Sequence, residues 1–223
     1  MSDDDRVRHS VAEEAALVTS ADEIARKEAY NSLVQAKRMN EVILGALHGD
    51  RPFRVRPSLF LDLNRLAIDG LSAYAGLWRP AAVKIQDSKH TPPGAHLVPE
   101  LVEQMCDYLN DSWASRTAVH LAAFTMWRTN WIHPFSDGNG RTARAVSNVV
   151  LSVRVGYFLP GSPTIPEQIV ANRAPYYKAL EEADGTFESK GFCDEVVSEL
   201  EELLASLLAR QLTSAFNNAV GDS

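Results

Sequence analysis

The segment HPFSDGNGRTAR, residues 133–144, combines residue types that are typical of chemistry on phosphate groups. Gly138 and Gly140 precede an apolar stretch that predicts a helix. A glycine-rich turn that leads into a helix directs unpaired backbone N–H groups outward, with the positive end of the helix dipole behind them. Because such turns bind anions, the segment predicts an anion-binding site.

Two arginines support this interpretation. Arg141 and Arg144 are three residues apart and therefore lie on one face of the first turn of the predicted helix. Cations at a helix N-terminus are unfavourable with the dipole, unless a multiply charged anion joins them. Since guanidinium groups bind phosphate through two parallel hydrogen bonds, we expect the phosphates of a nucleotide as the ligand.

Asp137 and His133 add a metal ligand and a base. Phosphate would repel the Asp137 carboxylate unless a hard cation such as Mg²⁺ lies between them. His133 ends the preceding predicted helix, and histidine is a common general base near neutral pH, so His133 is the candidate general base. Taken singly, each residue has a structural explanation, because histidines at helix ends, DGNG turns and exposed arginine pairs are common. The interpretation depends on their combination.

The elements around this segment are predicted from apolar periodicity and capping residues. Ser20 and Glu23 form an S-x-x-E capping box at the start of a long helix that ends at residues 48–50. Residues 82–85 form a short extended run followed by turn formers, which predicts a small hairpin or flap. Further helices are expected after Pro57, around 101–109, over 118–132 and 143–158, and over 195–210.

The helices over 118–132 and 143–158 have apolar residues on most faces, which is typical of helices buried in a core. The quoted segment joins them. With helix almost everywhere and one short extended run, the predicted class is all-α with a hairpin. Its 223 residues are enough for one sizeable domain with an appended segment.

Composition narrows the classes of function. The net charge of −7 argues against nucleic acid as the main partner, since phosphate backbones require a basic surface. Cys106 and Cys193 predict neither a disulfide framework nor a zinc site. The chain starts without an apolar signal-peptide core, and no run of about eighteen apolar residues occurs. We therefore expect no membrane partner and a cytoplasmic location.

The loop resembles the signature of the Fic-domain family, H-P-F-x-D-G-N-G-R-x-x-R, at every defined position. Residues 77–105 look like the β-hairpin flap of the family and the helix after it, and residues 172–184 look like the segment that contacts the nucleotide base. The resemblance implies an all-α Fic fold, a helical bundle with a short β-hairpin flap. It suggests an N-terminal segment and helix (1–50), a Fic core (51–190) and a C-terminal helix packed on the core (191–223).

The family transfers the AMP part of ATP to a hydroxyl group of a target protein. The resemblance therefore implies that His133 takes the proton from a Tyr, Ser or Thr hydroxyl, and that Asp137 holds Mg²⁺ between the α- and β-phosphates. The remaining loop residues would bind phosphates. Gly138, Asn139 and Gly140 would form the anion hole, to which Asn139 adds its side-chain amide, and Arg141 and Arg144 would hold the β- and γ-phosphates.

The flap and the downstream segment supply further candidates. By resemblance, Ser88, Lys89 and His90 would clamp the nucleotide and present the target in extended form, as in β-augmentation. A solvated turn explains Lys89 and His90 equally well. Tyr177 is the candidate nucleotide contact, whereas Tyr176 either shares that role or packs in the core. Asp184 stands where relatives often carry asparagine.

Many family members carry an inhibitory glutamate that pairs with the second arginine, in the motif S/T-x-x-x-E-G/N. Thr19 to Glu23 matches the first part, but Ile24 replaces the small residue, and the capping box already explains Glu23. Glu28, on the same predicted helix, is the preferred inhibitory candidate. The N-terminal helix would then be an inhibitory helix.

Several alternatives stay open. Removal of AMP from a modified protein uses the same residues and a glutamate that orients water. Doc-type relatives carry lysine at the position of Gly140 and transfer the γ-phosphate, so glycine favours AMP transfer. A non-catalytic nucleotide-binding regulator needs no general base such as His133. Besides the target protein, a homo-oligomer or a regulatory partner chain stays open.

Overall fold

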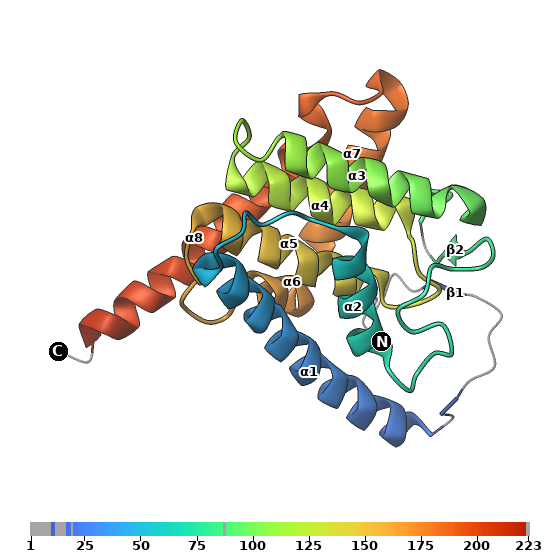
Figure 1. The fold of residues 1–223 in the computed structure, drawn as a ribbon, viewed down its shortest axis with the longest axis horizontal. Coiled ribbons are helices and arrows are strands. Elements are labelled where there is room, and N and C mark those ends of the chain that lie inside the picture. The colour runs from blue at the N-terminus through green and yellow to red at the C-terminus, as the bar shows by residue number, and fades with distance from the viewer. Residues whose placement is uncertain (1–9, 12–16, 19, 87, 222–223) are drawn as a thin grey trace.

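The computed structural model describes the chain apart from residues 1–9, 12–16, 19, 87 and 222–223 (Figure 1). Eight α-helices make up most of the described part, which confirms the predicted all-α class. Within the described residues, no helix combines the length and apolar character that a bilayer span requires. The helices are α1 (Ala21–His48), α2 (Pro57–Ile68), α3 (Val98–Asp111), α4 (Ala118–Ile132), α5 (Asn139–Val155), α6 (Ile165–Ala171), α7 (Ala174–Lys190) and α8 (Ser198–Gly221).

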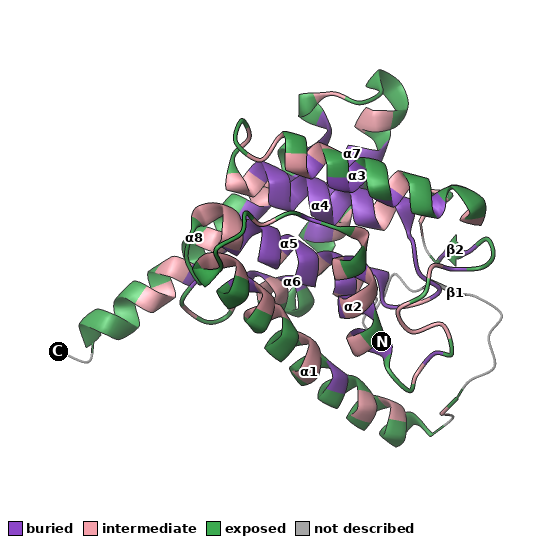
Figure 2. Cartoon of the chain, viewed as in Figure 1, coloured by how far each residue is buried: buried purple, intermediate pink, exposed green. Residues whose placement is uncertain are grey.

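Helices α4 and α5 form the centre of the molecule, and most of their residues are buried (Figure 2). Their apolar faces pack against each other, and Ser147 Oγ donates a hydrogen bond of 2.8 Å from α5 to Ala122 O of α4. Helices α2, α3, α7 and α8 pack around this pair. The two apolar segments of the sequence are therefore the core, as predicted. The boundaries of the three predicted parts of the chain stay predictions.

Helix α1 lies along the outside of α2 and α5 and is mostly exposed (Figures 1 and 2). Buried Asn31 fixes it, because its Nδ2 donates to Ala67 O at 3.4 Å and to Asp69 O at 2.9 Å. These carbonyls belong to the C-terminal end of α2, where carbonyl groups lack helical partners. Ser20 is the N-cap of α1 as predicted, but its side chain makes no capping hydrogen bond, so the capping box does not form.

The predicted hairpin is wrong. Strand β2 (Lys84–Ile85) pairs antiparallel with β1 (Ser10–Val11), which comes from the N-terminal segment. Ser10 lies opposite Ile85, and Val11 lies opposite Lys84. The described residues after β2 contain turns and the pair Pro92–Pro93, and proline donates no ladder hydrogen bond, so no second flap strand forms. The flap is a single short strand whose partner is remote in sequence.

A buried histidine joins three helices away from the predicted site. His120 of α4 is 6% exposed, and its Nδ1 lies 2.6 Å from Glu201 Oε1 of α8. Its Nε2 lies 2.8 Å from the hydroxyl of Tyr108 on α3. Because both ring nitrogens find polar partners, the imidazole is accommodated in the core and connects α3, α4 and α8.

We predict that Glu201→Ala lowers the free energy of unfolding by about 1–3 kcal/mol, since it leaves a buried imidazole nitrogen without its partner. Glu201→Gln keeps a hydrogen-bond acceptor and should therefore lower the free energy of unfolding by less. Chemical denaturation followed by circular dichroism measures both values. Glu202→Ala is the matched control, because Glu202 is the exposed neighbour. Equal midpoints for Glu201→Ala and Glu202→Ala would contradict this role.

Candidate active site

His133 is the C-cap residue of α4 and has left-handed backbone angles (φ 51°, ψ 59°). Its N–H donates to Thr129 O at 2.9 Å, and Pro134 then prevents the helix from continuing. The side chain is 6% exposed, and Nδ1 lies 3.2 Å from Asn130 O. Since a carbonyl oxygen only accepts, Nδ1 carries the proton of the neutral ring and Nε2 carries the lone pair. This ring orientation fits the candidate role of a general base.

Buried Arg79 holds the backbone at this point, and the sequence assigned it no role. Its side-chain Nε donates to His133 O at 2.8 Å, and its backbone N–H donates to Pro134 O at 2.9 Å. The same guanidinium donates to the carbonyls of Ala81 and Pro93 in the flap. Burial lowers the pKa of Arg79. One side chain therefore ties the flap to the start of the loop.

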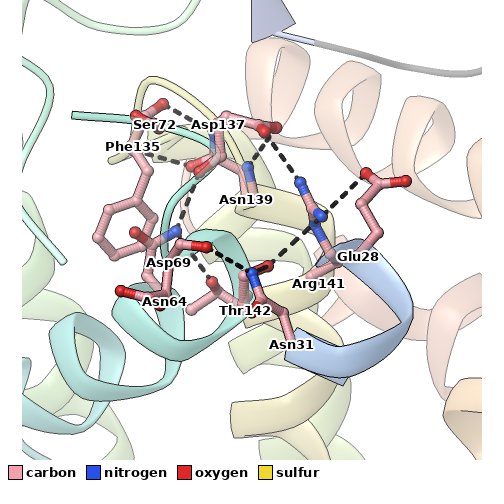
Figure 3. A network of polar contacts seen from close by, with 12 residues as sticks. Glu28, Asn31, Asn64, Asp69, Ser72, Phe135, Asp137, Asn139, Arg141 and Thr142 are labelled. Atoms are coloured by element: carbon pink, nitrogen blue, oxygen red, sulfur yellow. Dashed lines mark hydrogen bonds and ion pairs between the residues drawn. The ribbon is translucent and has the colours of Figure 1, made fainter. Parts of the chain in front are cut away.

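Gly138 is the N-cap of α5 with φ 77°, a conformation that favours glycine. A Cβ atom there would lie 2.8 Å from Ile68 Cγ2 and 3.0 Å from Asn64 Nδ2. Buried Asn64 donates to Asp137 O at 3.0 Å and to Thr142 Oγ1 at 3.3 Å, as Figure 3 shows. The close approach of α2 therefore requires glycine at this position and positions the loop through Asn64, a residue that the sequence interpretation missed.

Asn139 closes the loop with its side chain. Its Oδ1 accepts from Phe135 N at 2.9 Å, and its Nδ2 donates to Phe135 O at 2.8 Å. Phe135 is fully buried, with its ring centroid 5.1 Å from that of Trp78. We expected the amide of Asn139 to face the anion, but it is used inside the loop. The candidate donors to an anion are instead the backbone N–H groups of the first turn of α5, which have no acceptor within the helix.

Arg141 lies between two carboxylates (Figure 3). Its Nη2 is 2.9 Å from Asp137 Oδ2, and its Nη1 is 3.2 Å from Glu28 Oε1 of α1. The inhibitory glutamate was expected to pair with the second arginine, Arg144, so the structure corrects the partner to the first. Asn31, one turn after Glu28, explains this geometry because it fixes α1 against the end of α2.

Arg144 has a different environment. Within the described residues it forms no ion pair, and a Cβ atom on Gly140 would lie 3.2 Å from its Nη1. Burial is the main cause that lowers the pKa of Arg144, and the positive charges of Arg173 and Arg141 act in the same direction. Gly140 therefore leaves space for the second guanidinium, which is half-buried without a carboxylate beside it.

These residues surround one cavity of about 480 Å³. Tyr177 lies in its wall, and buried Tyr176 lies beside it with its hydroxyl accepting from Asn130 Nδ2 at 2.9 Å. Tyr176 thus both packs in the core and lines the cavity. The other lining residues are Glu28, Ser32, Ile85, Asn130, His133, Asp137, Gly138, Asn139, Gly140, Arg141, Arg144, Val170 and Arg173. Sequence reasoning missed Ser32, Ile85, Asn130, Val170 and Arg173.

The predicted flap contacts Ser88, Lys89 and His90 do not line this cavity. His90 Nε2 lies 2.7 Å from Trp131 O, and its N–H donates to Ser88 Oγ at 3.2 Å. His90 therefore fixes the flap onto α4, and Ile85 of β2 is the flap residue that faces the cavity. Asp184 is also directed inward, because its carboxylate accepts a hydrogen bond of 2.9 Å from Trp127 Nε1.

Asp137 fits a magnesium ion that is shared with phosphates. Within the described part of the chain, no group of three or more acidic, histidine or cysteine side chains is arranged to hold a metal by itself. Mg²⁺ commonly binds through one or two carboxylates together with substrate phosphates and water. A single carboxylate beside an anion-binding helix end matches that arrangement, and the Asp137 carboxylate is 41% exposed.

The comparison with known proteins shows a similarity that covers the site. Residues 54–151 match the model of the Fic/DOC family. This segment is therefore similar to Fic/DOC family domains. The matched residues include β2, α3, α4 and the loop from His133 to Arg144.

The similar curated proteins are protein adenylyltransferases. Protein adenylyltransferase Fic of Drosophila willistoni is 38% identical over 96 residues, which cover 43% of this chain and 18% of that protein. The Nematostella vectensis protein of the same name is 33% identical over 117 residues, covering 49% of this chain and 24% of that protein. The match therefore spans less than a quarter of these relatives.

Solved structures show the same fold. A Fic-domain-containing signalling protein from Bacteroides thetaiotaomicron superimposes with a TM-score of 0.71 at 24% identity, covering 92% of this chain and 76% of that chain. Residues 134–508 of Fic-1 from Caenorhabditis elegans superimpose with a TM-score of 0.69 at 21% identity, covering 92% of this chain and 54% of that chain. The helical bundle is therefore a Fic fold.

The packing around Gly138 yields a stability prediction for this fold. Gly138→Ala should lower the free energy of unfolding by about 1–3 kcal/mol, since it places a side chain at positive φ against Ile68. Gly185→Ala is the matched control, because Gly185 lies inside α7 with open space around its Cβ position, and alanine favours a helix. Chemical denaturation measures both variants. A Gly138→Ala variant as stable as Gly185→Ala would show that the close approach of α2 is not required.

Proposed function

We propose that this protein is an adenylyltransferase that transfers AMP from ATP to a Tyr, Ser or Thr hydroxyl of a target protein and releases pyrophosphate. The observation that carries the proposal is that one cavity contains an oriented histidine, a carboxylate and two arginines at the start of a helix. The names of the similar curated proteins support the same reaction.

Each group has a separate task in this reaction. His133 Nε2 takes the proton as the target hydroxyl oxygen attacks the α-phosphorus, and the bond from that phosphorus to the bridging oxygen of the β-phosphate breaks. The N–H groups at the start of α5 stabilise charge on the α-phosphate oxygens. Arg141 and Arg144 stabilise the departing pyrophosphate. Asp137 would hold Mg²⁺, which when bound neutralises phosphate charge.

Arg141 must change partners when the substrate binds. Arg141 pairs with both Asp137 and Glu28, so both carboxylates compete with phosphate oxygens for the same guanidinium. Release from Asp137 frees a carboxylate for the cation. Release from Glu28 frees Arg141 for the leaving group. We therefore propose Glu28 as an inhibitory residue that acts through Arg141.

His133→Ala should reduce transfer of label from α-³²P-ATP to protein in a lysate at least about 100-fold, because general-base catalysis contributes about 10²–10⁴-fold. Binding of magnesium-complexed ATP, measured by calorimetry, should stay unchanged. The control is His96→Ala, since His96 is an exposed histidine outside the cavity. Transfer of label from γ-³²P-ATP but not from α-³²P-ATP would mean that the protein phosphorylates its target and does not adenylylate it. Binding of ATP without any transfer would indicate a nucleotide-binding regulator.

Glu28→Gly should raise AMP transfer, including auto-modification, about two- to fivefold, because a partly exposed ion pair contributes at most about 1 kcal/mol. The measurement is the initial rate of protein labelling by α-³²P-ATP. Glu23→Gly is the matched control, since Glu23 lies on the same helix, is exposed and does not line the cavity. An unchanged rate for Glu28→Gly, or an equal rise for Glu23→Gly, would remove Glu28 from this role.

Removal of AMP from a modified protein is the second candidate function, and the position of Glu28 in the cavity wall favours it. A carboxylate there is suited to orient water toward a phosphodiester. Release of AMP from a purified adenylylated protein, lost in Glu28→Gly but independent of ATP, would identify this activity.

A further inference from the structure

Three guanidinium groups line the cavity, but only one of them is neutralised by the protein. Arg141 pairs with both acidic residues of the cavity wall, Glu28 and Asp137. Within the described residues, neither Arg144 nor Arg173 forms an ion pair. This part of the cavity therefore carries excess positive charge, although the chain as a whole has a net charge of −7.

Arg173 comes from a different element than the two arginines of α5. It is the N-cap residue of α7, three residues before Tyr176, so its position is fixed by a helix whose inner face is buried. It is close enough to Arg144 for its charge to oppose protonation of that guanidinium. Two like charges held near each other in partly desolvated surroundings are unfavourable unless an anion lies between them.

We propose that Arg173 is a third phosphate-binding residue, which together with Arg144 contacts the terminal phosphate of a nucleoside triphosphate. The inference rests on the proposed function for the identity of the ligand. It makes Arg173 a residue that distinguishes ATP from AMP, because the monophosphate does not extend to the distal arginines. Tyr177 and Ile85, by contrast, offer apolar or aromatic contacts that every adenine nucleotide can use.

The test compares binding of ATP and AMP, each with Mg²⁺, by calorimetry in a Glu28→Gly background. Arg173→Ala should weaken ATP binding about ten- to hundredfold, the range for a lost hydrogen bond to a charged group, and leave AMP binding within about twofold. The affinity of Arg173→Lys for ATP should lie between those of the parent and of Arg173→Ala, since lysine keeps the charge but not the planar fork. Lys178→Ala is the matched control, because Lys178 is exposed on the same helix and lies outside the cavity.

Equal losses for ATP and AMP would overturn the proposal and place Arg173 at the base or ribose. Unchanged ATP binding in Arg173→Ala, or no binding of either nucleotide by the parent protein, would also overturn it. Circular dichroism melting of each variant separates a binding defect from unfolding. If the parent binds ATP with the predicted dependence on Arg173 but transfers no AMP, the proposed function fails while this inference stands.

Discussion

The structure depends on a short loop that must satisfy its own backbone inside the protein. Residues 133–136 connect two buried helices and are buried themselves, so water does not compensate their carbonyl and N–H groups. Three side chains satisfy backbone groups of this loop and of the next residue, Asp137, and two of the three come from elsewhere in the chain. Arg79 binds the carbonyl of His133, Asn139 binds both backbone groups of Phe135, and Asn64 binds the carbonyl of Asp137. The orientation of His133 and of the start of α5, on which the proposed function depends, follows from these bonds.

The same arrangement creates an electrostatic problem that ligand binding resolves. Arginines at the beginning of a helix oppose its dipole, and burial removes the water that would otherwise screen them. The protein offers two carboxylates, and both are engaged by Arg141. Under the proposed function, the charge of Arg144 and Arg173 is balanced by the phosphates of the ligand. A cavity with this balance favours polyanions over neutral molecules, and it makes binding sensitive to ionic strength.

Much of the fold was predictable because it depends on local patterns. Apolar residues on most faces predicted the buried helices α4 and α5, and the glycines with flanking charges predicted the site between them. What could not be predicted depends on tertiary contacts. Asn64 and Arg79 are single polar residues in ordinary stretches, and only the folded chain shows that they bond to the loop.

Two errors have the same physical origin. The pairing partner of β2 was sought nearby, but strand pairing depends on which backbone edge reaches it in space, and that edge comes from residues 10–11. Glu28 was identified as facing the arginines, but the choice between Arg141 and Arg144 depends on the axial position of α1. That position is set by the bond of Asn31 to the end of α2, which sequence spacing does not reveal.

The pairing of β1 with β2 has a consequence for access. A strand has two edges, and one edge of β2 is already covered by the chain's own N-terminal segment (Figure 1). Any incoming polypeptide that pairs with β2 must therefore use the opposite edge or exchange with β1. A ladder of two residues is short enough for such an exchange at low cost.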